Sequence, residues 1–138
     1  MKFPEWLPVY GSQEFRGDCP QETPEQIAFF RIIRSDYPEQ GETAIHPKNE
    51  AKRKGKDFRV LQKDKALGMT KGASDIIIPG APSFVCELKR KDHTKSKWQD
   101  GQLDYLELCK NNGAFVCVAL GHEAALEAFK EWKSQVKG

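Results

Sequence analysis

The segment SDIIIPGAPSFVCELKR, which begins at Ser74, constrains the fold more than any other part of the chain. Its three consecutive isoleucines lie between Gly72 and a Pro79-Gly80 pair, and they indicate a short strand that is buried on both faces. A second apolar strand begins at Phe84, directly after the turn PGAPS. The two strands predict a β-hairpin at the centre of the protein.

A symmetric turn sets the register of this hairpin, with Ile77 opposite Val85 and Asp75 opposite Glu87. Opposed residues of antiparallel strands have Cβ atoms about 4.5–5.5 Å apart, and like charges at that spacing are destabilising. Lys89 lies two residues beyond Glu87 and therefore shares its face. The pattern predicts either a divalent-cation site or a solvated face on which Glu87 pairs with Lys89.

The donor types favour Mg²⁺ or Mn²⁺ over zinc at such a site. The four cysteines, at positions 19, 86, 109 and 117, have no CxxC spacing, and the three histidines form no cluster with them. Carboxylate oxygens are the ligands that hard cations prefer. We expect the cysteines to be reduced core thiols, and His46, His93 and His122 to be ordinary surface or loop residues.

The rest of the chain predicts helices and strands on either side of the hairpin. A buried helix is expected from Thr23, with Pro24 at its first position and Gln26 completing a capping box, and it should end at Pro38 and Gly41. The other expected elements are a strand at 42–46, a helix near 57–67, a helix at 97–111 with Gly113 as its cap, a strand in AFVCVAL and a helix at 123–136.

Length and composition bound the organisation of the protein. With 138 residues and 30% charged residues, the chain fits one soluble α/β domain. We assign residues 1–22, rich in Pro and Gly, to an extended arm across the domain or a partner subunit, and residues 23–138 to the domain. No apolar run is long enough to span a membrane and the N-terminus lacks a signal-peptide pattern, so a cytoplasmic location is expected.

Basic residues are concentrated on both sides of the hairpin, although the net charge is only +2. From Pro47 to Lys71 there are nine basic residues against three acidic ones, and a second cluster follows Lys89. Such clusters are often merely solvated, but this placement favours contacts to phosphates. The candidate nucleic-acid-binding residues are Lys48, Lys52, Arg53, Lys54, Lys56, Lys71, Arg90 and Lys91. Trp98 is expected to pack under a loop rather than to stack on a base.

Several of these motifs together resemble a known family. Asp75 followed by Glu87-Leu88-Lys89 matches the D…(E)xK signature of the PD-(D/E)XK nuclease superfamily. Within it, the chain resembles the VRR-NUC domains found in stand-alone phage enzymes and in eukaryotic DNA-repair nucleases. The resemblance runs from about Thr23 to Trp132, in GASDI, CELK, Gln102 eleven residues before Gly113, and AFVCVALGHEAALEAF. It implies a restriction-endonuclease-like α-β-β-β-α-β core, with helices flanking a central mixed sheet.

The resemblance also implies roles for single residues. Asp75, Glu87 and the backbone carbonyl of Leu88 would bind the metal, and Lys89 would orient the attacking water. Glu25 matches an acidic residue that many members add to the metal shell, although a Glu in the first turn of a helix is favoured by the helix dipole anyway. Gln102 matches a glutamine near the active site, with Gln99 as the competing choice.

The expected function is hydrolysis of phosphodiester bonds by a Mg²⁺- or Mn²⁺-dependent endonuclease. The resemblance implies a deoxyribonuclease that acts on branched or structured DNA as a homodimer, similar to Holliday-junction resolvases, in the host cytoplasm if the protein is phage-encoded. The alternatives are a nucleic-acid-binding protein that retains the nuclease fold without activity, and a restriction-like or RNA-directed nuclease.

Overall fold

A four-stranded mixed sheet in the order β1-β4-β3-β2 forms the centre of the protein. Strands β2 (Ile76–Ile78) and β3 (Phe84–Lys89) pair antiparallel, whereas β3 pairs parallel with β4 (Phe115–Leu120). Strand β1 (Val9–Tyr10) adds to the other edge of β4, also in parallel. The structure is a computed structural model that describes residues 1–47 and 58–136.

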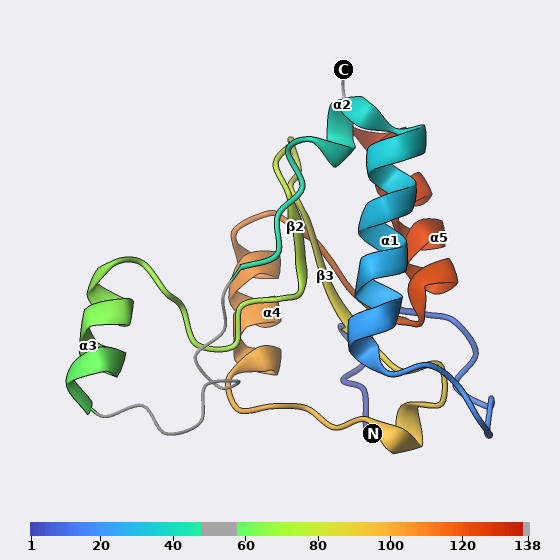
Figure 1. Cartoon of the computed structure of the whole chain (residues 1–138), viewed down its shortest axis with the longest axis horizontal. Helices are drawn as coiled ribbons and strands as arrows, with labels where there is room; N and C mark the ends of the chain where they lie inside the picture. The colour runs from blue at the N-terminus through green and yellow to red at the C-terminus, as the bar shows by residue number, and fades with distance from the viewer. Residues whose placement is uncertain (48–57, 137–138) are drawn as a thin grey trace.

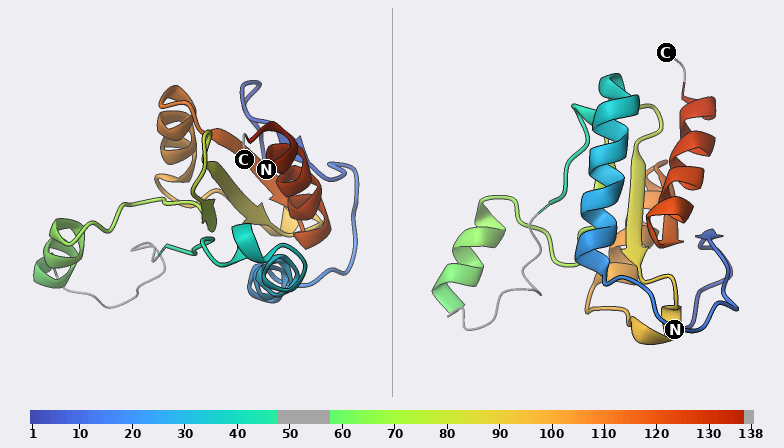
Figure 2. Two further views of the ribbon diagram at one scale, coloured as in Figure 1. Left: turned by 90° about the horizontal axis from the view of Figure 1, so that it is seen from above. Right: turned by 45° about the vertical axis from the view of Figure 1, so that its right-hand side comes forward.

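Helices cover both faces of this sheet (Figures 1 and 2). Helices α1 (Glu22–Asp36) and α5 (His122–Gln135) pack on one face, and α4 (Gln102–Asn111) packs on the other. The short α2 (Pro38–Gly41) follows α1, while α3 (Phe58–Ala66) projects away from the sheet (Figure 1). The expected α/β class, a mixed sheet flanked by helices, is confirmed.

The alternation of side chains along β3 determines which groups reach which face. Phe84, Cys86 and Leu88 are buried in the larger core with α1 and α5. Val85 belongs to the smaller core on the α4 side. Because successive residues of a strand point to opposite faces, Glu87 and Lys89 follow Val85 onto the α4 side.

The N-terminal segment lies across the domain, which was one of its two expected positions. The side chain of Leu7 is buried in the smaller core, and the carbonyl of Pro8 accepts a hydrogen bond from the Val118 N–H. Part of the segment is regular, since Val9 and Tyr10 form β1. Sequence composition did not indicate this strand, because it depends on pairing with distant β4.

The boundaries of two predicted elements need correction. Helix α1 begins at Glu22 with Gln21 as its N-cap residue, and no side chain caps it, so Thr23 lies inside the helix and the predicted capping box is wrong. The strand expected at 42–46 is reduced to one antiparallel bridge between Ile45 and Ile77. The other predicted strands and the helix near 57–67 are confirmed.

Helix α4 is shorter than predicted. It begins at Gln102, so residues 97–101 of the helix predicted at 97–111 contain no helix. A 3₁₀ turn over His93–Lys95 comes before this stretch. The irregular backbone of residues 96–100 matters for the site described below.

All four cysteines are free thiols, but only Cys86 and Cys117 are buried in the core as expected, whereas Cys19 and Cys109 are half-buried. Cys86 and Cys117 are register partners on β3 and β4 and are completely buried. A hydrogen bond with the Cys117 thiol and burial raise the pKa of Cys86, so this thiol stays protonated. Among the helices that the structure describes, none combines the length and the apolar character needed to cross a membrane.

Candidate active site

The hairpin register brings two acidic side chains to one position. Ile76 pairs with Cys86 and Ile77 with Val85, as predicted, and the next step of the same register places Asp75 opposite Glu87. Both side chains are buried, with 3% and 1% of their residue surfaces exposed. A solvated sheet face, the alternative reading of this pattern, is therefore wrong.

Asp75 is oriented by the end of the neighbouring strand. Its Oδ2 atom accepts a hydrogen bond of 3.0 Å from the N–H of Leu88. The carbonyl of the next residue, Lys89, points the other way, toward β4, where it accepts from Gly121 N–H. Since successive carbonyls of a strand alternate in direction, the Leu88 carbonyl points toward the β2 edge, on the same side as Asp75.

The ammonium of Lys89 is held by the loop that precedes α4. It donates to the Lys97 carbonyl at 2.8 Å and to Gln102 Oε1 at 2.9 Å, and it lies 5.4 Å from the centroid of the Trp98 ring. Only 1% of the residue is exposed. A buried ammonium needs such partners because desolvation penalises the charged form.

Gln102 joins the lysine to the carboxylate. Its Oε1 accepts from Lys89 and from the Gln99 N–H, the latter at 2.8 Å, and its Nε2 donates to Glu87 Oε1 at 3.1 Å. Because two donors point at Oε1, the amide nitrogen must face the carboxylate. The choice between the two glutamines is thereby clear: the Gln102 side chain enters the site, whereas Gln99 contributes its backbone N–H.

A close contact between two glycines places this glutamine at the first residue of α4. A Cβ atom on Gly72 would lie 2.2 Å from the backbone carbonyl carbon and oxygen of Gly101 and 2.7 Å from the Gln102 nitrogen. Gly72 also has φ +77°, which L side chains rarely adopt. The sequence GASD therefore lets the α4 start approach the hairpin closely enough for Gln102 to reach Glu87.

Glu25 contacts the start of α5 in this structure. Its carboxylate accepts from the His122 N–H at 2.8 Å and lies 3.0 Å from His122 Nδ1. Gly121 leaves room for it, since a Cβ there would be 2.6 Å from Glu25 Oε2. A carboxylate at a helix N-terminus is stabilised by the helix dipole. Among the described residues, no group of three or more His, Cys, Asp or Glu side chains is placed to hold a metal ion, so Glu25 forms no such group with Asp75 and Glu87.

His46 is an exposed residue outside the helices and strands, as expected, whereas His93 is buried. The Nδ1 atom of His46 lies 2.8 Å from the backbone carbonyl of Asp75. His93 is buried and its Nε2 lies 3.0 Å from the Gln13 carbonyl. The isolated bridge between Ile45 and Ile77 places His46 against the main chain of Asp75, and the sequence of residues 42–46 did not reveal that pairing.

Of the candidate nucleic-acid-binding residues, the structure describes only Lys71, Arg90 and Lys91. Lys48, Lys52, Arg53, Lys54 and Lys56 lie outside the described residues. Lys71 is exposed and forms an ion pair with Asp100.

Arg90 and Lys91 contact the N-terminal segment. The Arg90 guanidinium donates to the carbonyls of Cys19 and Pro20, and the Lys91 ammonium lies 4.6 Å from the centroid of the Phe15 ring. These contacts hold the segment against the end of β3.

Comparison with known proteins supports this architecture at the level of the fold. A solved structure described as a VRR_NUC domain protein superposes with a TM-score of 0.68 and 16% sequence identity, over 85% of this chain and 91% of that chain. The fold is VRR-NUC-like. No family model matches the chain, and no curated protein matches it.

Proposed function

We propose that this VRR-NUC-like protein is a divalent-cation-dependent nuclease of the PD-(D/E)XK type that hydrolyses phosphodiester bonds in structured or branched DNA. The observation that carries the proposal is the buried link from Lys89 through Gln102 to Glu87, next to Asp75. It combines an ammonium, an oriented amide and two carboxylates at the open end of the hairpin.

A purely structural role accounts poorly for this arrangement. Burying charged groups costs free energy of desolvation, and well-packed apolar residues usually stabilise such a position equally well or better. Here an ammonium and two carboxylates are buried at the end of an otherwise apolar hairpin. Buried charged groups that a fold does not need for stability are typical of functional sites.

The donor set fits a hard divalent cation. Asp75, Glu87 and the Leu88 carbonyl supply only oxygen atoms, the ligand type that Mg²⁺ and Mn²⁺ prefer. When bound, such an ion supplies Lewis-acid stabilisation of the phosphate and lowers the pKa of a water ligand. The remaining chemistry belongs to the side chains.

Lys89 is the residue best placed to contact the nucleophilic water. Two of its three N–H groups donate to acceptors in the described part of the chain, Lys97 O and Gln102 Oε1, and we expect the third to contact the water or a phosphate oxygen. Gln102 positions this ammonium relative to Glu87. Asp75 is kept in place by the Leu88 N–H.

A cleavage assay tests the proposal directly. Labelled four-way junctions, flaps, linear duplex and RNA are incubated with the protein and Mg²⁺ or Mn²⁺, with EDTA as the blank. We expect the unaltered protein to cleave a branched or flap DNA and the Glu87→Gln variant to leave the same DNA uncut. Glu107→Gln, which removes an exposed carboxylate from α4, is the matched control and should cleave like the unaltered protein.

The outcomes of this assay separate the candidate functions. Equal cleavage by Glu87→Gln and by the unaltered protein would exclude this site as the origin of the activity. Metal-insensitive DNA binding without cleavage would support the non-catalytic alternative, and cleavage of RNA alone would correct the substrate class.

We also propose that the active form is a homodimer. A two-fold symmetric junction carries two equivalent strands to be cut, whereas the described part of one chain presents one carboxylate pair of this kind. Sedimentation analysis should show a dimer in the presence of junction DNA. A monomer that cleaves both strands of a junction with uncorrelated timing would contradict this.

A further inference from the structure

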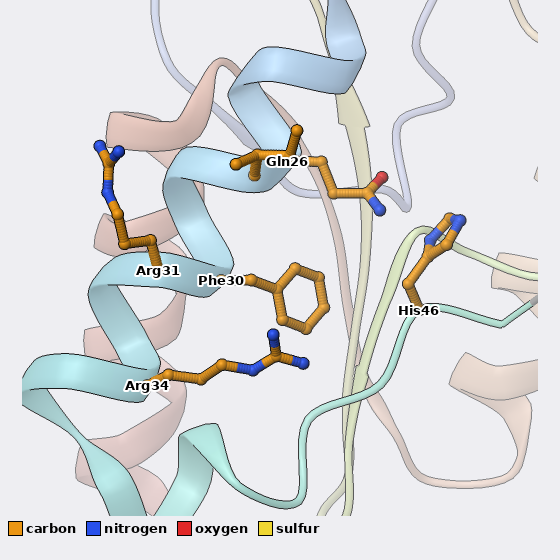
Figure 3. A pocket seen from close by; sticks show the side chains of 6 residues that line it. Gln26, Phe30, Arg31, Arg34 and His46 are labelled. Atoms are coloured by element: carbon orange, nitrogen blue, oxygen red, sulfur yellow. The ribbon is translucent and has the colours of Figure 1, made fainter.

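A groove of about 640 Å³ lies between α1 and His46. We call it the α1 groove. Figure 3 shows Gln26, Phe30 and Arg34 projecting from α1 toward His46, which forms the opposite wall. The residues that line the groove are Gln26, Ile27, Phe30, Arg31, Arg34 and His46.

The charged groups of the α1 groove have one sign. Arg31 and Arg34 are its two charged lining residues, and no acidic side chain is among those described. Figure 3 shows the Arg34 guanidinium directed toward His46 and the Arg31 side chain directed away from it. The Arg34 guanidinium lies 5.0 Å from the centroid of the Phe30 ring, which holds it over the floor. This charge distribution complements a polyanion.

The groove is also partly apolar, which restricts the kind of polyanion. Ile27 is 61% exposed, and Ile45, beside His46, is 53% exposed. A duplex presents mainly phosphates and sugars outward, so apolar walls contribute little to its binding. An unpaired strand presents base faces as well as phosphates, and apolar surfaces and guanidinium planes bind base faces.

One contact joins this groove to the main chain of Asp75, a residue of the candidate active site. His46 Nδ1 lies 2.8 Å from the Asp75 carbonyl, so the far wall of the groove is attached to a residue of the candidate active site. A strand in the groove would pass His46 and round the β2 edge of the sheet to reach the Asp75 and Glu87 side chains on the α4 side. We propose that the α1 groove binds an unpaired nucleic-acid strand adjacent to the phosphodiester to be cut, an inference that rests on the proposed nuclease function.

A second copy of the chain is a poorer occupant. In a two-fold symmetric contact the same patch of both copies takes part, so a contact centred on this groove would bring the Arg31 and Arg34 pairs of both copies into one interface. Like charges placed close together oppose association. A single strand instead supplies the opposite charge together with apolar base faces.

Binding measurements with an Arg31→Gln/Arg34→Gln variant test this inference. The probes are fluorescein-labelled oligothymidylate, an abasic strand of the same length and a matched duplex, followed by fluorescence anisotropy in EDTA at several NaCl concentrations. The charge-matched control is Lys110→Gln/Lys130→Gln, on exposed positions of α4 and α5. Thermal unfolding monitored by circular dichroism checks that both variants fold.

We expect the arginine variant to raise the Kd for oligothymidylate at least about tenfold and to leave duplex affinity nearly unchanged. The slope of log K against log salt should fall by about 1.4, because each phosphate contact to a single strand contributes about 0.7. The control should bind all probes like the unaltered protein. Ile27→Ser, at an exposed position, should remove the preference for oligothymidylate over the abasic strand.

Three results would overturn the inference: equal weakening of single-strand and duplex binding, no weakening of either, or a change in sedimentation without a change in binding. The last would assign the groove to a second copy of the chain. Failure of the nuclease proposal is distinguishable, because it is read from cleavage by Glu87→Gln, a residue outside the groove.

Discussion

Gln102 is the residue on which the polar contacts of the candidate site converge. It accepts from Lys89 and from the Gln99 N–H, and it donates to Glu87. Its contacts with Lys89 and Glu87 are buried, so their loss cannot be replaced by contacts with bulk water, and its contact with the Gln99 N–H is partly buried. The amide orients charges without adding one, since a carboxylate at this position could not donate to Glu87.

Replacing Gln102 with Leu should therefore lower the cleavage rate by about 10–100-fold, the range for residues that orient the groups that bind a metal. Unsatisfied polar partners should lower the free energy of unfolding by about 1–3 kcal/mol. Cleavage kinetics and urea unfolding measure the two effects. Gln99→Leu is the control, because the Gln99 side chain is exposed and the residue contributes only its backbone N–H to the site. A comparable loss of activity in that variant would contradict the assignment.

A substitution of Lys89 should change the cleavage rate without changing the stability of the fold. Lys89→Met keeps the length of the side chain and removes a buried charge, which often leaves stability unchanged or raises it. We expect cleavage to fall by about 10²–10⁴-fold, as for loss of a group that assists proton transfer, while the urea midpoint changes little. A variant that loses stability and activity in parallel would instead indicate a structural role for the ammonium.

At the scale of elements, the site depends on the close approach of the hairpin entry and the α4 start. Gly72→Ala would place a Cβ atom 2.2 Å from Gly101 backbone atoms at a residue with φ +77°. We expect a destabilisation of at least about 2 kcal/mol together with lower activity, because Gln102 must move. Gly113→Ala, with φ +93° and nothing within 4 Å of the added atom, isolates the cost of the backbone conformation alone. Equal effects of the two substitutions would show that the close approach does not matter.

Some features of these elements follow from the local sequence and others do not. The hairpin register follows from the turn length and from the isoleucine run, so Ile77 opposite Val85 could be predicted from the sequence. The start of α4 could not, because it depends on Gly72 contacting Gly101 from a distant part of the chain. The strand predicted at 42–46 was wrong for the same reason, because the pairing of Ile45 with Ile77 depends on the folded sheet and not on the local sequence.

Across the whole molecule, the N-terminal segment supports the loop that holds Lys89. The Trp98 indole N–H donates to the Lys2 carbonyl at 2.8 Å, and its ring packs edge-on against Phe3. Trp98 thus packs under the loop, as expected, and it also faces the Lys89 ammonium. Composition predicts an extended arm for this segment, but its contribution to the site depends on contacts that are remote in sequence.

Asp92 fixes another part of the same segment and makes its attachment dependent on pH. A hydrogen bond from the Thr94 hydroxyl, followed by one from the Gly17 N–H, lowers the pKa of Asp92 to about 2. An unfolded Asp titrates near about 3.9, so its stabilising effect is complete above that pH and is lost as the pH falls toward 2.

The stability difference between the unaltered protein and Asp92→Asn should therefore be constant above about pH 5 and vanish between about pH 4 and 2. Urea unfolding over a pH series measures it, with the exposed Asp18→Asn as the control. A difference that persists unchanged at about pH 2 would show that the pKa of Asp92 is not the cause.

The measurement that tests the central claim most directly is the crystal structure of the protein soaked in Mn²⁺, with the ion located by its anomalous scattering. The account predicts one strong peak between the carboxylates of Asp75 and Glu87, about 2 Å from their oxygens and from the Leu88 carbonyl, and none in crystals of Glu87→Gln. An occupied Mn²⁺ site elsewhere, with no peak between these two carboxylates, would contradict it.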